Sequence, residues 1–305
     1  MNETLVRRLR LDDVQSDPMF GEALKIWNDT VATSGADAGV AALAAICDPT
    51  TNLFHSDMNA SSVLGYRVKT LRQSFDLRHT RGEEIGSYPD AKYVDAILAP
   101  NYTTAAAENE PIFRRIMTPM VGTFAVYEGI LLPYFEKAGR NALSLSRLLY
   151  LADDIEAAEP VTLTDRERRC LEFLCGGLSA KQIAHFLKIS TRTVEHDIEK
   201  IKIKVQARNV SHAVAKGLFS YGLQAGQPSA PTSKTPLRNL SVRERQCLSL
   251  LTSGNSSKAI AEALSISART AEKHLNSAKD KLGASKAVDL VAKGAAAAVA
   301  SVYGD

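Results

Sequence analysis

The sequence predicts a multidomain protein, in which one α+β domain precedes two all-α domains of a single kind. Two segments that begin at Leu163 and Leu240 superpose without a gap at an offset of 77 residues. A repeat of this length indicates one folded unit made twice, because a solenoid needs at least three copies at a shorter period. The residues before the repeats mix strand-like and helix-like patterns. We therefore expect domains at residues 1–152, 161–223 and 237–305, with a flexible linker at 224–236.

The first half of the chain begins with a predicted helix and two or more strands. Helical periodicity covers residues 19–31, around the single tryptophan, Trp27. Strand patterns follow at 40–47, 52–55 and 68–71. These segments form the first part of the α+β domain.

Helices and a strand hairpin complete that domain. We expect a turn at 84–88, a helix at 92–99 that ends before Pro100, and a helix at 103–108. Strands are predicted at 112–117 and 124–133, broken at Val121-Gly122, before an apolar segment at 143–151 that fits a strand or a helix.

Each repeat is predicted to contain four helices. The first opens with a capping box, Thr164-x-x-Glu167 or Ser241-x-x-Glu244, and closes near a glycine. A second short helix leads through a tight break into a longer third helix. The third helices carry apolar stripes at helical spacing, namely Val194, Ile198, Ile201 and Val205, and Ala271, Leu275, Ala278 and Leu282. This order predicts a helix-turn-helix.

The outer face of the third helix indicates what it contacts. The exposed side chains are predicted to be Glu195, His196, Glu199, Lys200 and Lys202 in the first repeat, and Glu272, Lys273, Asn276 and Lys279 in the second. Lys, Asn and His can donate to base edges and phosphates, and Glu can accept from cytosine. The alternative is that these residues form only a solvated helix face.

Both repeats resemble the LuxR/FixJ-type helix-turn-helix family. The motif residues include Lys181-Gln182-Ile183-Ala184 and Arg192-Thr193-Val194-Glu195 in the first repeat, and Lys258-x-Ile260-Ala261 and Glu272-x-His274-Leu275 in the second. The resemblance implies that the third helix enters the major groove of promoter DNA and that the fourth can mediate pairing. It implies base-facing roles for Glu272, Lys273, Asn276, Glu195, His196 and Glu199. It implies phosphate contacts for Lys258, Arg269, Lys279, Lys281, Lys181, Arg192, Lys202 and Lys204.

The repeats depart from the family pattern in different ways. Asp197 stands where the family has histidine, and we expect Asp197 and Glu199 to add negative charge near the groove. Ala271 replaces the usual valine of the second repeat. The second repeat is therefore expected to read DNA better. The rival hypothesis is an antiactivator or adaptor, in which the repeats bind protein instead of DNA.

Charge is divided unevenly along the chain. Residues 1–160 carry a net charge of −7, whereas residues 161–305 carry +10. The cations thus lie where a phosphate backbone needs them. The linker QAGQPSAPTSKTP is rich in Pro, Ser and Gly and could span roughly 40 Å. One chain could then cover two half-sites, with its fourth helices packed together. The other arrangement is a homodimer of chains, which we expect slightly more.

Nothing in the sequence predicts catalysis, a cofactor or a metal. His55 and His79 lie near Asp57 and Asp76, but neither pair has a nucleophile beside it. Cys170 and Cys247 occupy equivalent core positions, and no C-x-x-C pair exists. A signal peptide and an apolar run of membrane length are missing from this sequence, so we expect a cytoplasmic location and no membrane partner.

The first half of the chain resembles a PAS-like domain. The resemblance rests on Gly82-x-x-Ile85-Gly86, Pro111-Ile112-Phe113-Arg114 and Tyr127-Glu128-x-x-Leu131-Leu132-Pro133. It implies a sensor of a small-molecule ligand or a surface for a protein partner. A phosphoacceptor receiver and a lactone-binding pocket fit the sequence less well. The whole chain is therefore expected to be a transcriptional regulator.

Overall fold

The computed structural model describes residues 5–9, 14–15, 17–31, 36–75, 83–120, 123–137, 139–155, 162–219 and 236–303. The chain divides into two compact units. Residues 4–121 and 126–148 form the first, which we call the sheet unit. Residues 1–3, 122–125 and 149–305 form the second, the helical unit.

A six-stranded sheet is the centre of the sheet unit. Its strands run in the order β1-β4-β5-β6-β2-β3, and the pairs β1·β4, β2·β3 and β2·β6 are antiparallel. Their bounds are β1 Leu5–Arg8, β2 Thr51–Asp57, β3 Arg67–Arg72, β4 Ile112–Met120, β5 Thr123–Glu136 and β6 Gly139–Asp153. The outer ends of β5 and β6 belong to the helical unit.

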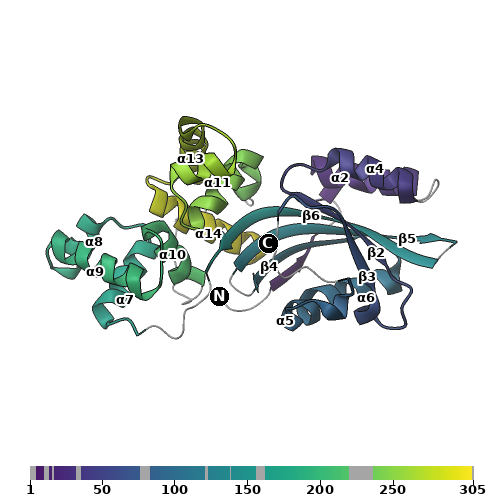
Figure 1. Ribbon diagram of the computed structural model, residues 1–305, viewed down its shortest axis with the longest axis horizontal. Helices are drawn as coiled ribbons and strands as arrows, with labels where there is room; N and C mark the ends of the chain where they lie inside the picture. The colour runs from purple at the N-terminus through teal and green to yellow at the C-terminus, as the bar shows by residue number, and fades with distance from the viewer. Residues whose placement is uncertain are drawn as a thin grey trace. The chain divides into compact units, whose positions relative to one another are not determined.

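Helices cover both faces of this sheet (Figure 1). One face carries α2 (Pro18–Ile26), its π-helical extension Trp27–Val31, and α4 (Ala36–Ile46). The other carries α5 (Ala91–Tyr93), a π-helical turn at Val94–Leu98, and α6 (Ala99–Glu108). Side chains alternate between the faces along a strand, so Ile130 and Leu132 pack under α2 and α4 while Leu131 packs under α6.

A buried network of charges ties α2 to the sheet. Asp17 caps α2 by accepting from the Met19 and Phe20 amides, each at 3.1 Å. Its carboxylate also pairs with Arg147 of β6 at 2.6 Å. Arg147 and Arg115 both bind Glu128, which is fully buried. Buried charges that are paired and hydrogen-bonded in this way are tolerated in a core, whereas an unpaired buried charge is strongly destabilising.

In the first half of the chain, two predicted segments differ from the structure, and a third, predicted as either a strand or a helix, is now assigned. The strand predicted at 40–47 was wrong, since residues 40–46 belong to α4, whose alanine-rich sequence favours a helix over a strand. The helix at 92–99 continues past Pro100, because a π-helical turn at Val94–Leu98 leads directly into α6, whose second residue is Pro100. The closing segment is a strand, β6. The predicted break at 121–122 lies outside the described residues, as do His79 and Gly82.

The helical unit contains the two repeats. The first comprises α7 (Asp165–Cys175), α8 (Ala180–Leu187), α9 (Thr191–Lys204) and α10 (Val210–Phe219). The second comprises α11 (Val242–Thr252), α12 (Ser257–Ala263), α13 (Ala268–Leu282) and α14 (Ala287–Tyr303), after a 3-10 turn at Pro236–Asn239. Both predicted capping boxes are present, at Thr164 and Ser241. Residues 224–235 of the predicted linker lie outside the described residues.

Two kinds of feature are absent from the described residues. None of their helices has both the length and the apolar character needed to cross a membrane. No cluster of three or more His, Cys, Asp or Glu side chains suited to a metal ion occurs within the described ranges.

Candidate nucleic-acid interface

A tight turn joins the second and third helices of each repeat. Lys188 and Ser265 occupy equivalent positions in it and adopt left-handed backbone angles, with φ of 55° and 53°. Ser190 and Ser267 then cap the third helices, accepting from the Thr193 and Thr270 amides at 3.0 Å. The turn therefore sets the direction in which α9 and α13 leave α8 and α12.

The third helices are buried on one side and open on the other. Their predicted apolar stripes are buried from Val194 to Ile201 and from Ala271 to Ala278. Six predicted base-facing side chains are all exposed: Glu195, His196, Glu199, Glu272, Lys273 and Asn276. The two helices thus present their polar faces outward, as a helix that enters a groove must.

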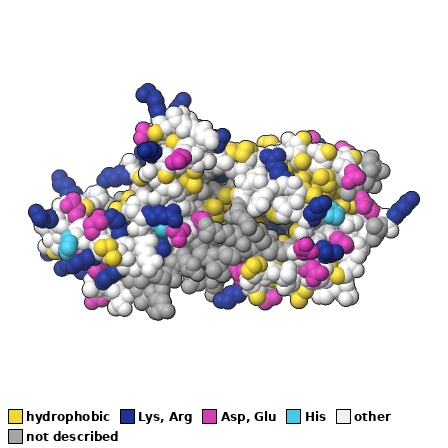
Figure 2. Space-filling model, in the orientation of Figure 1, with side chains coloured by type: hydrophobic (Ala, Val, Ile, Leu, Met, Phe, Trp, Pro, Cys, Tyr) yellow, Lys and Arg dark blue, Asp and Glu magenta, His cyan; other side chains and the backbone are white. Residues whose placement is uncertain are grey.

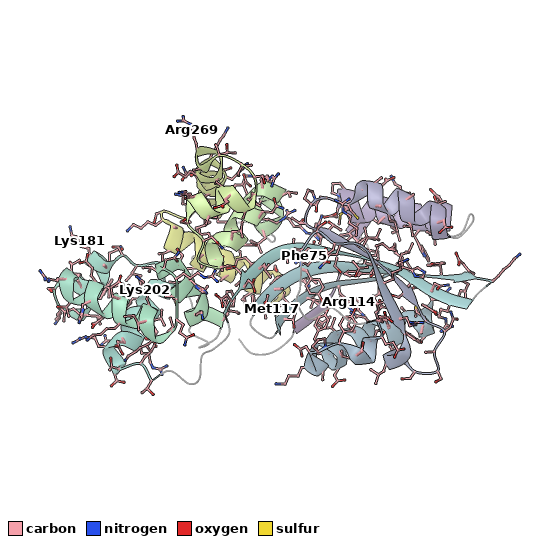
Figure 3. All side chains as sticks on the ribbon, viewed as in Figure 1. Phe75, Arg114, Met117, Lys181, Lys202 and Arg269 are labelled. Carbon is pink, nitrogen blue, oxygen red and sulfur yellow. The ribbon has the colours of Figure 1, made fainter. Side chains whose placement is uncertain are left out.

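The eight predicted phosphate contacts fall into three groups, which are exposed, half-buried, and paired within their own repeat. Lys181, Arg192, Lys258 and Arg269 are exposed, and Figure 3 shows Lys181 and Arg269 pointing outward from their repeats. Figure 2 shows Lys and Arg side chains standing out from the repeats, interspersed with Asp and Glu. Lys279 is half-buried near the end of α13.

Three of the other predicted phosphate ligands have partners inside their own repeat. Lys202 pairs with Glu199 at 2.7 Å. Lys204 and Lys281 bind the capping-box carboxylates Glu167 and Glu244 at 2.6 and 2.8 Å. These lysines must break or share an ion pair before they can contact a phosphate.

The prediction that Asp197 adds charge near the groove was wrong. Asp197 is 1% exposed, and its two carboxylate oxygens accept from Nε and Nη2 of Arg166 at 2.6 and 2.9 Å. The bidentate pair neutralises the acid and holds the start of α7 against α9. In the second repeat the equivalent residues are Arg243 and His274, and Arg243 instead donates to Gln246 at 3.1 Å.

Glu167 and Glu244 each join two helices of their repeat. Burial alone would raise the pKa of both carboxyls, but the Lys204 and Lys281 hydrogen bonds, with capping-box bonds to Thr164 and Ser241, lower it overall. In the second repeat Ser277 adds a hydrogen bond of 2.7 Å to Glu244. Both glutamates therefore remain charged well into the acidic range.

The cysteines of the first helices behave as core residues. Cys170 and Cys247 are fully buried, as predicted. Burial raises the pKa of each thiol to about 11. The thiolate that binds metals or reacts with oxidants is therefore suppressed at neutral pH.

The sheet unit contains a cavity that was not predicted from the sequence. The space measures about 90 Å³ and lies between the sheet and the α5–α6 segment. Its polar lining consists of Tyr88, Tyr93, Tyr102, Tyr127, Asn101, Arg114, Ser144 and Ser146, and the rest is mostly aliphatic. One signal was available in the sequence: Arg114 shares a strand face with Ile112 and Ile116, where a charge is unexpected.

The polar groups around this cavity are ordered by hydrogen bonds. The Tyr93 and Tyr127 hydroxyls lie 2.7 Å apart, and Nε of Arg114 donates to Asn101 Oδ1 at 3.2 Å. Burial raises the pKa of Tyr93 to about 12, so its phenol stays neutral. Figure 3 shows Arg114 on the side of the sheet that α5 and α6 cover.

Both repeats match a known family of sequences. The model described as "Bacterial regulatory proteins, luxR family" matches residues 161–216 and 238–293. The transcriptional regulatory protein FixJ of Rhizobium meliloti is 33% identical over 89 residues, which are 29% of this chain and 43% of that protein. FixJ of Bradyrhizobium diazoefficiens is 39% identical over 79 residues, 26% of this chain and 38% of that protein. The matches span less than half of either relative.

Solved structures of LuxR-type receptors also align with the chain. A phage VqmA–DPO complex covers 65% of this chain and 95% of its own, with 21% identity and a TM-score of 0.25. A Vibrio cholerae VqmA dimer without target DNA covers 48% of this chain and 72% of its own, with 18% identity and a TM-score of 0.21. Scores this low carry no argument about the fold.

Proposed function

We propose that this chain, which carries two LuxR-family helix-turn-helix domains, is a transcriptional regulator that binds promoter DNA through α9 and α13. The observation that carries the proposal is the pair of exposed third helices, flanked by the exposed cations Lys181, Arg192, Lys258 and Arg269. Lys273 and Asn276 are suited to base edges, and the four flanking cations to phosphates. The excess of positive charge in residues 161–305 supports the same function.

Binding of the full chain to duplex DNA tests this proposal. The affinity, measured by fluorescence anisotropy, should fall by orders of magnitude between about 50 and 200 mM salt, because the chain neutralises several phosphates and releases their counterions. Arg192→Glu combined with Arg269→Glu should weaken binding at least about tenfold. Lys25→Glu, a matched change on the exposed side of α2, should leave it unaltered. Salt-independent binding, or none, would contradict the proposal.

The sheet unit is proposed to be a PAS-like sensor of a small molecule. Setting β1 aside, its strand order β4-β5-β6-β2-β3, with helices between β3 and β4, is the order of PAS domains and supports this assignment. The cavity supports it further, because apolar walls with a few convergent donors suit a small ligand. Arg114 and Asn101 would hold the polar end of such a ligand.

Thermal unfolding of the full chain tests this sensor. Butyrate and its uncharged match, butanol, probe the acceptor that Arg114 prefers. We expect butyrate to raise the melting temperature of the native chain and not that of Arg114→Gln. A shift that persists in Arg114→Gln would show that the cavity is not where the molecule binds.

One observation favours the second candidate function, that of an adaptor. Phe186 on α8 is 59% exposed and stacks on Phe173 with ring centroids 5.7 Å apart. The second repeat has Ala263 at the equivalent position. An exposed aromatic pair suits a protein partner better than DNA. If the first repeat acts in this way, Arg192→Glu alone should leave the DNA affinity unchanged.

A further inference from the structure

The two repeats pack against each other inside the helical unit. The fourth helices α10 and α14 are in contact. In addition, α10 contacts α11, and α14 contacts α7. Exchange of the two repeats maps the α10·α14 contact onto itself and turns the α10·α11 contact into the α14·α7 contact, which is the pattern of an isologous, two-fold interface.

Two equivalent glycines make equivalent contacts across this interface. Gly177 and Gly254 have φ of 80° and 84° and are equivalent at the offset of 77 residues. A methyl group on Gly177 would lie 2.8 Å from Asp289 Oδ1, and one on Gly254 would lie 2.9 Å from Cβ of His212. His212 and Asp289 are themselves equivalent residues of the fourth helices.

His212 and Asp289 also play the same local role. His212 Nδ1 accepts from the Arg208 amide at 3.2 Å, and Asp289 Oδ2 accepts from the Ser285 amide at 2.7 Å. Each side chain therefore orders the start of its own helix and packs on the glycine of the other repeat. The two-fold relation between the repeats is therefore a property of the backbone, and it holds although one position is histidine and the other aspartate.

Helix α10 is covered by α7 and α9 of its own repeat, by α11 and α14 of the other, and by Phe124, which stacks on Phe219 with ring centroids 4.0 Å apart. Every residue from Ser211 to Phe219 is buried, and even Lys216 is only 4% exposed. Direct bonds cross the interface, because Arg208 Nη1 and Asn209 Nδ2 donate to the carbonyls of Ser253 and Gly254 at 2.9 and 2.8 Å. A helix enclosed in this way is part of a core and is closed to a second chain.

We propose that one chain is an internal dimer that reads a single inverted-repeat operator, one half-site with α9 and the other with α13. This inference rests on the proposed DNA-binding function and adds the form of the DNA. The two-fold rotation that exchanges α10 and α14 also exchanges the third helices. Two readers related in this way meet their half-sites in opposite orientations.

The half-sites of this operator differ in sequence. His196 and Glu199 in the first repeat stand where the second has Lys273 and Asn276. Glu accepts from cytosine, whereas Asn and Lys prefer adenine and guanine. The operator is thus an imperfect palindrome with a fixed polarity, which a homodimer of identical readers does not require.

Selection from a random duplex library of about three helical turns tests the inference with the full chain. The recovered sequences should contain two unlike half-sites in inverted orientation, with centres a whole number of helical turns apart, roughly 34 Å each. Native mass spectrometry should find one chain per duplex. A direct repeat, a lone half-site, or two chains on one duplex would overturn the internal dimer while leaving DNA binding intact. Absence of any duplex binding would overturn the proposed function itself.

A pair of glycine variants tests the interface. Gly254→Ala adds a methyl group against His212, whereas Gly283→Ala meets only Lys293 Nζ at 3.9 Å. Both positions have positive φ, so both variants carry the same kind of backbone strain. With helicity retained, Gly254→Ala should lose at least about tenfold more affinity for the selected duplex than Gly283→Ala. Equal losses would show that the interface plays no part in recognition.

Discussion

Position 197 shows how a single residue separates two copies of one domain. A carboxylate placed on the buried side of α9 needs a cation, and Arg166 supplies it across the repeat. His274 at the equivalent position is half-buried and needs no such partner. Arg243, the counterpart of Arg166, is consequently left on the surface with Gln246. Equivalent arginines thus pair with a buried carboxylate in one repeat and with a surface glutamine in the other.

Truncation of these two arginines should have unequal effects. Arg166→Ala leaves the buried Asp197 carboxylate unpaired and should destabilise the chain, because a charged group then loses its hydrogen bonds without full access to water. Arg243→Ala, the matched control, should cost less than about 0.5 kcal/mol. Hydrogen exchange should show faster amide exchange in α7 and α9 for Arg166→Ala only. Equal exchange in the two variants would show that the ion pair contributes nothing.

The base-facing residues lead to a second prediction at this scale. Lys273→Ala and Asn276→Ala should each weaken binding to the selected duplex by about 1–3 kcal/mol and relax sequence preference. His196→Ala should cost less, because Glu195 and Glu199 keep negative charge on the exposed face of α9, and Glu199→Ala should cost less because it removes part of that charge. Anisotropy titrations measure each affinity, with Lys25→Ala as the charge control. Similar losses from both repeats would contradict the expected inequality.

Helices are held together in each repeat by a glutamate with two tasks. Glu167 completes the capping box of α7 and binds Lys204 in the last turn of α9. Glu244 and Lys281 do the same for α11 and α13. The start of one helix is thereby fixed to the end of another, which sets how far the third helix projects.

Acid should therefore loosen both repeats. Because the folded-state pKa of Glu167 and Glu244 lies below the ordinary value of about 4.3, their stabilisation is complete above that pH and is lost as the pH falls through the folded-state pKa. The melting temperature followed by circular dichroism should drop steeply below about pH 4. The double variant Glu167→Gln, Glu244→Gln should melt lower at pH 7 and depend less on acid. An unchanged acid dependence would exclude these carboxyls as the cause.

In the molecule as a whole, the interface between the two repeats determines their relative orientation more than the linker that connects them does. The charge pattern and the linker length are compatible with two repeats that move independently. The packing of α10 on α14 instead supports the proposal that the repeats form one body. The linker then only connects the repeats, and the packing of the fourth helices determines their relative orientation.

Cleavage of the linker tests this view. With a protease site placed within residues 224–235, the two fragments should stay together after cleavage and elute as one species in size-exclusion chromatography. The buried contacts along α10, with apolar burial contributing about 25 cal/mol per Å², provide the reason. Elution as two separate species would mean that the repeats are independent, and that DNA alone brings them together.

The sequence by itself determined the repeats, their caps and their exposed faces, because these features depend on local spacing. A capping box, a stripe at helical period and a glycine with positive φ are each set by residues within a few positions. The strands at 68–71 and 124–133 followed from local pattern in the same way. The segment 40–47 did not, since a short apolar run fits either a strand or a helix.

Only the tertiary structure decided which charges remain free, where the cavity lies and how the repeats meet. Asp197 is neutralised by a residue 31 positions away, and Glu128 by two arginines from neighbouring strands. Arg114 faces a cavity because separate strands and helices enclose it. The matching contacts of Gly177 with Asp289 and of Gly254 with His212 depend on the packing of two whole repeats. Each of these features is a contact between distant residues, and spacing along the chain carries no information on such a contact.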